Sequence, residues 1–170
     1  MFKPFLSDSL LLRDARPEDL LLMLEIYNDA VLTTSSTFDL EPLDIVTRKK
    51  WFDEHDMHYP LITAEATGSV AGYCCISPYS KKTGYSKTVE LSVYVHKKYR
   101  GQGIGTALIK DMIARSRRLG YHAIISSISD SNYESEKLHR RLGFELRGSM
   151  RQLGYKFGEW HDVALYELIL

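Results

Sequence analysis

The chain has 170 residues and is 44% hydrophobic, so it can bury one core but is too short for two ordinary domains, and we expect a single domain over residues 1–170. Its 22 Lys and Arg residues balance its 22 Asp and Glu residues, and this zero net charge argues against a nucleic acid or an anionic membrane as partner. No stretch approaches the roughly 18 consecutive apolar residues of a membrane span, and residues 1–9 lack the layout of a signal peptide, so we expect a cytoplasmic protein.

The first part of the chain has a short apolar run followed by helical patterns. The run, Leu10–Leu12, precedes Pro17, which occupies a position that the first turn of a helix tolerates. We predict a helix from there to about Val31, because its apolar residues recur at spacings of three and four: Leu20, Met23, Leu24, Tyr27 and Val31. A second helix is expected after Pro42.

The middle of the chain has the composition of strands. Residues 61–66 and 70–76 are two apolar runs on either side of a glycine-containing turn, which predicts a hairpin. Cys74 and Cys75 are adjacent, so on a strand they point to opposite faces and cannot form an ordinary disulfide with each other; we expect them to pack. Residues 88–95 have the β-branched and aromatic content of a long strand, and a glycine-rich turn follows them directly.

The last part of the chain is predicted to alternate between helix and strand. The predicted elements are a helix from Ile104 to Leu119, a strand over residues 123–128, a helix that ends at Gly143, and two strands over residues 144–153 and 163–170. Residues 154–158 are expected to connect the last two strands. Strands interleaved with helices, with hairpins at both ends, predict a mixed α/β sheet rather than a purely parallel one.

The most informative segment is Arg100-Gly101-Gln102-Gly103-Ile104-Gly105-Thr106, between a predicted strand and a predicted helix. Glycines let the backbone approach a ligand closely, and the helix start behind them presents unpaired N–H groups and a positive dipole end to an anion. A pyrophosphate group suits such a loop. From the loop alone, an ordinary glycine turn is about as good an explanation, because glycine is the general turn residue.

Three known phosphate-binding loops can be compared with this segment. The Walker A loop requires a Gly-Lys-Ser/Thr string, which this sequence lacks. The dinucleotide-binding fingerprint needs a small residue where Thr106 stands, and it belongs at an early strand-to-helix turn. The third pattern, Arg/Gln-x-x-Gly-x-Gly/Ala, is the acyl-CoA loop of the GNAT superfamily, and it is met at Arg100, Gly103 and Gly105.

Outward from this loop, the chain resembles the phosphinothricin and methionine sulfoximine acetyltransferases of the GNAT superfamily, from about Leu11 to Leu168. The resemblance is carried by motifs in family order: Ile26-Tyr27-Asn28, Thr88-Val89-Glu90 leading into Ser92-Val93-Tyr94-Val95, the glycine loop, Asn132-x-x-Ser135-x-x-Leu138-His139, and Gly154-Tyr155-Lys156-x-Gly158-x-Trp160-x-Asp162. It implies an acetyltransferase with the GNAT fold, which is a mixed, mostly antiparallel sheet of six to seven strands flanked by about four helices.

The resemblance implies acetyl-CoA as the cosubstrate. The implied cofactor-binding residues are Val93, Tyr94, Val95, Arg100, Gly101, Gln102, Gly103, Ile104, Gly105, Thr106 and Asn132. In the family, the strand before the loop usually carries a bulge that splays it from the next parallel strand, so an amide near Val95 would stabilise the tetrahedral oxyanion. Asn132 also suits the N-cap of a helix, and the two roles are compatible.

Acceptor amines are mostly protonated near neutral pH, so some group must take a proton before or during attack on the thioester. The resemblance points to Glu90 as that base, acting directly or through water, and to His139 as a supporting acid/base or positioning group. Tyr94 and Tyr133 are further candidates for protonating the CoA thiolate. By residue type alone, a strand Glu usually faces solvent and a lone helical His usually lies at the surface.

The loop before the strand of Glu90 departs from the family pattern. The family places an arginine there that pairs with an acidic group of the substrate, whereas alignment to Tyr85 and Glu90 puts Lys82 at this position. These three are the implied substrate-binding residues. Arginine grips a carboxylate or phosphinate at two points and lysine is a mobile point charge, so the exchange argues against phosphinothricin itself. A solvated Lys81-Lys82 pair explains the loop about as well.

Two further expectations concern metal and assembly. His55 and His58 form a His-x-x-His string near Asp56, but no further ligand cluster accompanies them, so we predict no metal. Dimers are common in the subfamily that the chain resembles, which implies a homodimer.

We therefore expect direct acetyl transfer from acetyl-CoA to the amine of a small amino acid or amino-acid analogue. Two alternatives stay open. One is a GNAT acetyltransferase with another amine acceptor, such as a polyamine or a protein N-terminus, for which the loop over residues 77–86 is the discriminating feature. The other is a non-catalytic acyl-CoA-binding protein, which would bind CoA without turnover.

Overall fold

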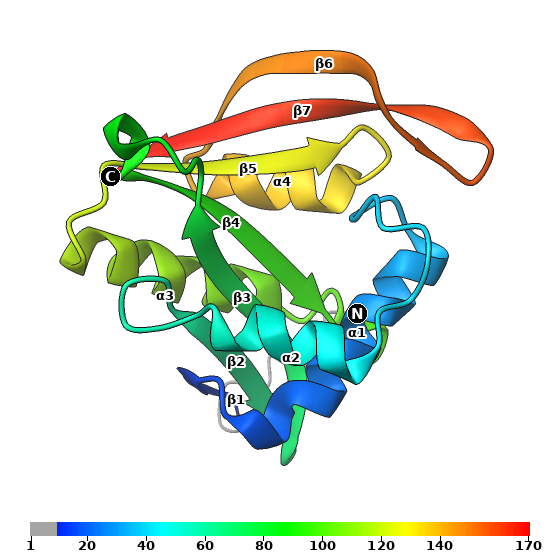
Figure 1. Cartoon of the computed structure of the whole chain (residues 1–170), viewed down its shortest axis with the longest axis vertical. Helices are drawn as coiled ribbons and strands as arrows, with labels where there is room; N and C mark the ends of the chain where they lie inside the picture. The colour runs from blue at the N-terminus through cyan, green and yellow to red at the C-terminus, as the bar shows by residue number, and fades with distance from the viewer. Residues whose placement is uncertain (1–9) are drawn as a thin grey trace.

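The computed structural model describes residues 10–170, which form one seven-stranded sheet with helices packed on both faces (Figure 1). The strand order is β1-β2-β3-β4-β5-β7-β6, and the pairs are antiparallel except for β4 with β5. The strands are β1 (Leu10–Asp14), β2 (Leu61–Ala66), β3 (Ser69–Pro78), β4 (Thr88–Val95), β5 (Ala123–Ser129), β6 (Glu145–Lys156) and β7 (Glu159–Ile169). The α-helices of this part are α1 (Leu20–Thr33), α2 (Ile45–Asp53), α3 (Ile104–Arg118) and α4 (Tyr133–Arg141). The predicted mixed, mostly antiparallel sheet is confirmed.

The two faces of the sheet bury separate apolar clusters. On β3, Cys74 and Ile76 belong to the larger cluster, which α3 covers, whereas Tyr73 and Cys75 belong to a smaller cluster with residues of α1. This alternation follows from the two-residue period of a strand. Both cysteines are free and buried, as the sequence predicts, and burial raises the pKa of each thiol, so neither is an activated nucleophile.

The sheet opens between β4 and β5. These two strands pair only where Thr88, Val89 and Glu90 face the start of β5. Beyond Glu90, residues 91–95 stay paired with β3, while residues 126–129 stay paired with β7. The predicted splay of the two parallel strands is therefore present. The bulge expected to cause it is not, because residues 89–95 keep an unshifted register against β3.

The last hairpin is longer than the sequence predicts. Residues 154–156 belong to β6 rather than to a connection, and β7 begins at Glu159, so the turn consists of Phe157 and Gly158. Both have positive φ, at 55° and 80°, which matches the twist of a two-residue hairpin turn. The glycine and aromatic residues of this segment are typical of a loop, which is why the sequence predicts a connection there. Whether they form a strand depends on pairing with β7, which a local pattern does not report.

Candidate active site

A cleft of about 1050 Å³ lies at the opening between β4 and β5. Its walls come from the C-terminal part of α1 and the residues after it, from the end of β4, from the glycine loop, from α4, and from the end of the β6–β7 hairpin. The predicted cofactor-binding residues that line it are Val93, Tyr94, Val95, Arg100, Gly101, Gly103, Ile104, Gly105, Thr106 and Asn132. The structure thus brings together residues that lie far apart in the sequence.

The glycine loop ends at the start of α3 with its backbone directed for an anion. Gly103 is the N-cap residue in the left-handed conformation, at φ 82°, which non-glycine residues rarely adopt. The first helical bond runs from Ala107 N to Gly103 O at 3.0 Å, so the N–H groups of Ile104, Gly105 and Thr106 have no acceptor within the helix. Together with the helix dipole, these donors make a site for a phosphate group.

Two side chains of the loop behave differently from one another. Arg100 lines the cleft, and its Nε donates to the carbonyl of Val95 at 3.1 Å, which ties the loop to the end of β4. Gln102, which was predicted to bind the cofactor, donates from Nε2 to the carbonyl of Lys98 at 3.0 Å and is not among the cleft-lining residues. This bond holds the loop together.

The unpaired edge of β4 presents backbone N–H groups to the gap between β4 and β5. His96 N donates to Ala71 O at 2.9 Å and Tyr79 N to Thr88 O at 3.4 Å, which shows that the even-numbered residues of β4 point their backbone groups at β3. Because N–H groups alternate along a strand, those of Val93 and Val95 point the other way, toward β5. Since β5 has diverged at this point, a bound ligand can meet them.

Glu90 lies where the two strands separate. It is the last residue of β4 that pairs with β5, and Ser127 Oγ on β5 donates to its Oε1 at 3.1 Å. Its side chain is half-buried, and it lies on the same face of the sheet as Tyr94, because both are even-numbered residues of one strand. Glu90 is not among the residues lining the large cleft; Val93, three residues further along β4, is the first of this strand that is.

Tyr94 lines the cleft and is enclosed by aromatic rings. It stacks on Tyr73 with centroids 5.3 Å apart, and it meets Tyr27 edge-on at 5.3 Å. Burial raises the pKa of its phenol, so the group keeps its proton at neutral pH and can donate it. Tyr133, the other tyrosine considered, is 66% exposed and does not line the cleft.

His139 is enclosed in the protein rather than exposed. Its side chain is 2% exposed and packs edge-on against Phe144, with ring centroids 4.9 Å apart. Nδ1 donates to the carbonyl of Ser135 at 2.8 Å, and Nε2 is buried without a partner. His139 does not line the cleft, although its neighbours Ser135 and Leu138 do. This position favours a packing role beneath α4 over direct acid/base chemistry.

Burial lowers the pKa of His139 below its usual 6.5, which gives a test by acid denaturation. As pH falls below about 6.5, the unfolded chain takes up a proton that the folded chain resists, so stability falls. Thermal denaturation between about pH 7 and 5 measures this. We expect the melting temperature to fall less for His139→Leu than for the wild type. Burial also lowers the pKa of His55, so the melting temperature of the variant should still fall with pH, but less steeply. Equal slopes in both proteins would contradict this account.

Asn132 caps α4, as expected, and its position allows the predicted cofactor contact. It is the N-cap of α4, with Oδ1 accepting from Ser135 N at 3.3 Å, and it lines the cleft. Its Nδ2 also donates to Ser36 Oγ at 3.0 Å, so it links α4 to the segment that follows α1. That segment is a wall of the cleft that the sequence did not indicate.

The predicted acceptor residues of the β3–β4 loop lie away from the large cleft. Lys82 and Tyr85 are exposed, and neither lines it. Tyr85 packs edge-on against Tyr79 at 5.6 Å, and its N–H donates to the carbonyl of Lys82 at 3.0 Å. The loop returns into β4 just before Glu90, so it is placed to contact an acceptor that approaches Glu90 from outside the cofactor cleft.

Several cleft residues had no sequence signal. Ser35, Ser131, Phe157 and His161 all line the cleft, and they come from three separate parts of the chain. Their shared position depends on long-range strand pairing. Among them, His161 alone is of a residue type used in acid/base chemistry, and the family motif Trp160-x-Asp162 leaves its position unspecified.

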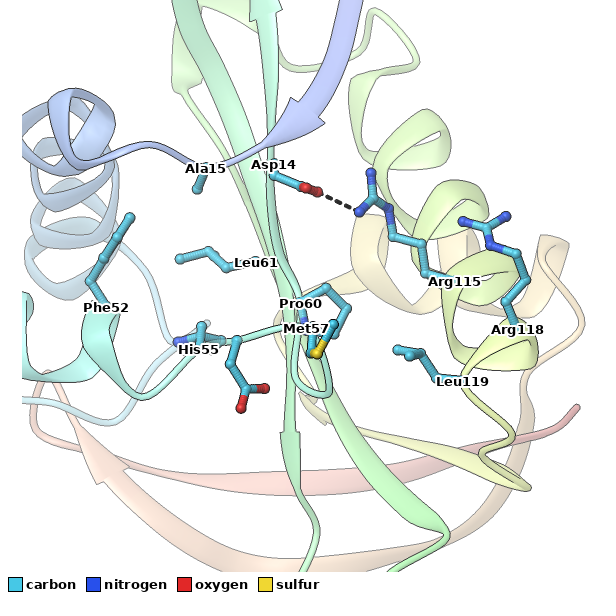
Figure 2. Close-up of a pocket in the computed structure, with 11 residues that line it drawn as sticks. Asp14, Ala15, Phe52, His55, Met57, Pro60, Leu61, Arg115, Arg118 and Leu119 are labelled. Carbon is cyan, nitrogen blue, oxygen red and sulfur yellow. Dashed lines mark hydrogen bonds and ion pairs between the residues drawn. The ribbon is translucent and has the colours of Figure 1, made fainter.

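A second, smaller cavity of about 440 Å³ lies between the ends of β1 and α3 and the loop after α2 (Figure 2). Arg115 forms an ion pair with Asp14 at its edge, and His55 is on its wall. His55 and His58 do not converge with a third ligand, and residues 10–170 contain no group of three or more His, Cys, Asp or Glu side chains suited to a metal ion. No described helix has both the length and the apolar character that crossing a membrane needs.

Comparison with known proteins agrees with this geometry. The family model for the acetyltransferase (GNAT) family matches residues 23–144. The L-methionine sulfoximine/L-methionine sulfone acetyltransferase of Pseudomonas paraeruginosa is 42% identical over 161 residues, which cover 94% of each protein. The structure of a phosphinothricin acetyltransferase from Sinorhizobium meliloti, in complex with acetyl-CoA, has a TM-score of 0.92 at 35% identity and covers 95% of this chain and 89% of that one.

A third relative has a different kind of acceptor in its name. The crystal structure of a ribosomal-protein-alanine N-acetyltransferase from Brucella melitensis has a TM-score of 0.91 at 37% identity and covers 94% of this chain and 99% of that one. The fold agrees with that of these relatives. The chain belongs to the GNAT family of acetyltransferases.

Proposed function

We propose that this protein transfers an acetyl group from acetyl-CoA directly to the amine of a small amino acid or amino-acid analogue. One observation carries the proposal: β4 separates from β5 directly after Glu90, and the end of β4 beyond that point lines a cleft that also contains an anion-binding loop. The relatives from Pseudomonas and Sinorhizobium, named for methionine sulfoximine and phosphinothricin, support this acceptor class.

The residues of the cleft fit acetyl-CoA. When bound, acetyl-CoA supplies an acetyl group activated as a thioester. The N–H groups at the start of α3 and the guanidinium of Arg100 would hold its diphosphate. The N–H groups of Val93 and Val95 would pair with the amides of the pantetheine arm, and that of Val95 would polarise the thioester carbonyl.

Glu90 and Tyr94 divide the proton transfers between them. Glu90 would take the proton of the acceptor ammonium, and the hydrogen bond from Ser127 holds its carboxylate in one orientation. Tyr94, whose buried phenol keeps its proton, would donate to the leaving sulfur. His139 would contribute only by holding α4 in place, since its ring is enclosed against Phe144.

The charge of Lys82 decides how an acidic acceptor is recognised. Lys82 is exposed, and in the part of the chain that the structure describes it forms no ion pair, so its ammonium is available to a carboxylate or a phosphinate. An exposed pair of this kind is worth at most about 1 kcal/mol. We therefore expect Lys82→Ala to raise KM about two- to fivefold for amino acids with an acidic side chain, such as phosphinothricin.

The measurement is acetyl-CoA consumption across a panel of amines, with and without an acidic group. Lys81→Ala is the matched control, because it removes a neighbouring charge from the same loop. The effect of Lys82→Ala should be confined to acidic acceptors and to KM. A uniform change for all acceptors would contradict the contact, and a clear preference of the wild type for peptides over free amino acids would contradict the proposed acceptor class.

A protein N-terminus is the second candidate acceptor. It is favoured by the likeness to the Brucella melitensis protein, which is named for a ribosomal-protein alanine. The same panel separates the two candidates when it includes a peptide that begins with alanine.

We also propose that the protein works as a cytoplasmic homodimer, with residues 1–170 acting as one domain. β6 is an edge strand, and the side chains over residues 145–153 are exposed. Large apolar side chains on this hairpin are open to solvent, including Leu153 at 54% and Trp160 at 59%. An exposed edge with apolar side chains is prone to pair with another chain, and a second copy of this protein is the occupant that a symmetric interface would supply.

A further inference from the structure

His161 lies just after the turn of the β6–β7 hairpin and lines the cofactor cleft. A shift in register brings it there: Met150 pairs with Val163, but Gly154 pairs with His161, so β6 has extra residues between the two pairs. One of them, Gln152, has a positive φ of 52° and donates its N–H to Asp162 Oδ1 at 2.8 Å. Such bulges bend a strand and redirect its side chains, so this one turns the end of the hairpin toward the cleft.

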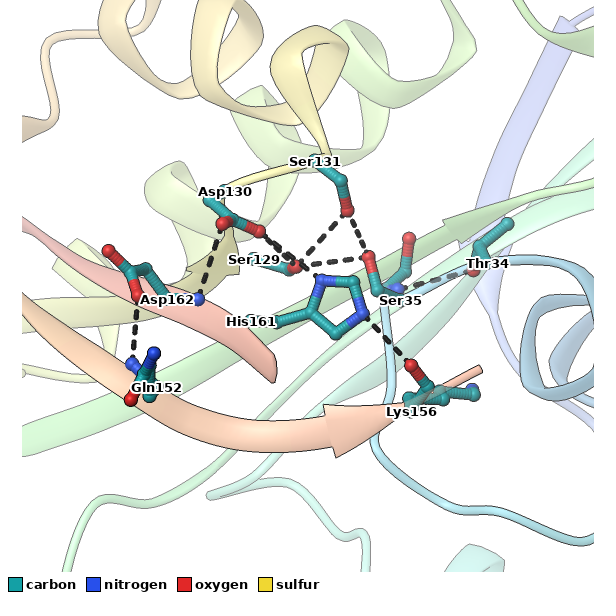
Figure 3. Close-up of polar contacts among 10 residues, drawn as sticks. Thr34, Ser35, Ser129, Asp130, Ser131, Gln152, Lys156, His161 and Asp162 are labelled. Atoms are coloured by element: carbon teal, nitrogen blue, oxygen red, sulfur yellow. Dashed lines mark hydrogen bonds and ion pairs between the residues drawn. The ribbon is translucent and has the colours of Figure 1, made fainter. Parts of the chain in front are cut away.

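Both ring nitrogens of His161 face hydrogen-bond acceptors (Figure 3). Nδ1 is 3.4 Å from Asp130 Oδ1, and Nε2 is 3.3 Å from the carbonyl oxygen of Lys156. The side chain is 8% exposed, so water cannot easily replace these contacts. The ring therefore lies between an acceptor on the loop before α4 and an acceptor on the β6–β7 hairpin.

Asp130 connects the ring to the loop before α4. Its N–H donates to the carbonyl of Asp162 at 3.0 Å, and its Oδ2 accepts from Asp162 N at 3.3 Å. Ser129 Oγ donates to Ser35 Oγ at 2.9 Å and lies 3.3 Å from Asp130 Oδ1, and Ser35 also bonds to Ser131. Since Ser35, Ser131 and His161 all line the cleft, this network joins three of its walls (Figure 3).

Other charged groups surround this network. The ammonium of Lys156 donates to the carbonyl of Thr37 at 2.7 Å, and burial lowers its pKa, which the nearby carboxylate of Asp39 opposes. Glu134 and Arg141 of α4 line the same cleft.

We propose that His161 is a positioning residue for the cofactor: packed between Asp130 and the hairpin, it holds Ser131 and Asn132 against CoA. The inference rests on the proposed function, because CoA is the proposed occupant of the cleft. It assigns the ring no contact with the reacting atoms.

Calorimetry of CoA binding to the full chain tests this. His161→Gln should weaken the Kd for CoA about three- to tenfold relative to the wild type, whereas kcat at saturating acetyl-CoA should stay within about twofold, because the ring touches none of the reacting atoms. Thermal denaturation of both proteins checks that the variant folds.

Two further variants keep the test decisive. Asp130→Asn removes the carboxylate from the other side, so it should also weaken the Kd for CoA, and its effect should not add to that of His161→Gln. His58→Gln, at an exposed histidine before β2, should behave as the wild type. Equal Kd values for CoA in the wild type and His161→Gln would overturn the inference alone. No CoA binding by the wild type would overturn the proposed function, and this inference with it.

Discussion

Glu90→Gln should lower kcat by about 10²- to 10⁴-fold, the range that removal of a general base typically costs. The amide keeps the size of the carboxylate but cannot take the proton of the acceptor ammonium. Because Glu90 does not line the cofactor cleft, the Kd for CoA should stay unchanged. Steady-state kinetics together with calorimetry of CoA binding separates the two effects.

The control for this variant is Glu54→Gln, an exposed carboxylate at the end of α2. It removes the same charge from the chain at a site without contact to the cleft, and its kcat should match the wild type. If Glu90→Gln kept full activity across the pH range, the base would be another group or solvent. If it lost CoA binding as well, Glu90 would have a structural role at the start of the strand opening.

Gly105→Val should weaken CoA binding by about 10- to 100-fold, which is about 1.4 to 2.7 kcal/mol. A Cβ at this position would already lie 3.0 Å from Leu138 Cδ2 and 3.7 Å from Val95 Cγ2. The two further methyl groups of valine would occupy the cleft next to the N–H groups that we expect to hold the diphosphate. Calorimetry with CoA measures the loss.

Gly84→Val is the matched control for that variant. A Cβ on Gly84 meets nothing within 4 Å, so the same substitution there adds the same side chain without a clash. It should bind CoA as the wild type does, and thermal denaturation of both variants checks that they fold. Equal Kd values for Gly105→Val and the wild type would mean that the diphosphate does not sit at the start of α3.

The sequence predicts the cofactor half of the site well. Residues 88–95 form β4 and Ile104 begins α3, as expected, because a β-branched run and an amphipathic stripe on either side of a glycine turn are strong local signals. Gly103 and Gly105 were predicted from the pattern of the loop. The left-handed backbone of Gly103 and the close packing around Gly105 explain why the pattern needs glycine at these positions.

The remaining parts of the site depend on contacts that no local pattern reports. The sequence places His139 on an amphipathic helix, but its ring is enclosed against Phe144, which lies beyond the end of that helix. His161 reaches the cleft only because the β6–β7 register shifts between Met150 and Gly154. The contribution of Ser35 likewise follows from its bonds to Ser129 and Ser131 across the fold. These are tertiary effects, which override residue preferences.

The separation of β4 from β5 also sets a limit on how far this protein can be stabilised. Closing the gap would give each strand a neighbour along its full length, and the chain would resist heat and denaturant better. It would also use up the very amides that we expect CoA to meet. Stabilising substitutions that keep activity must therefore lie elsewhere in the fold. Variants in which β4 and β5 pair along their full length should be more stable and inactive.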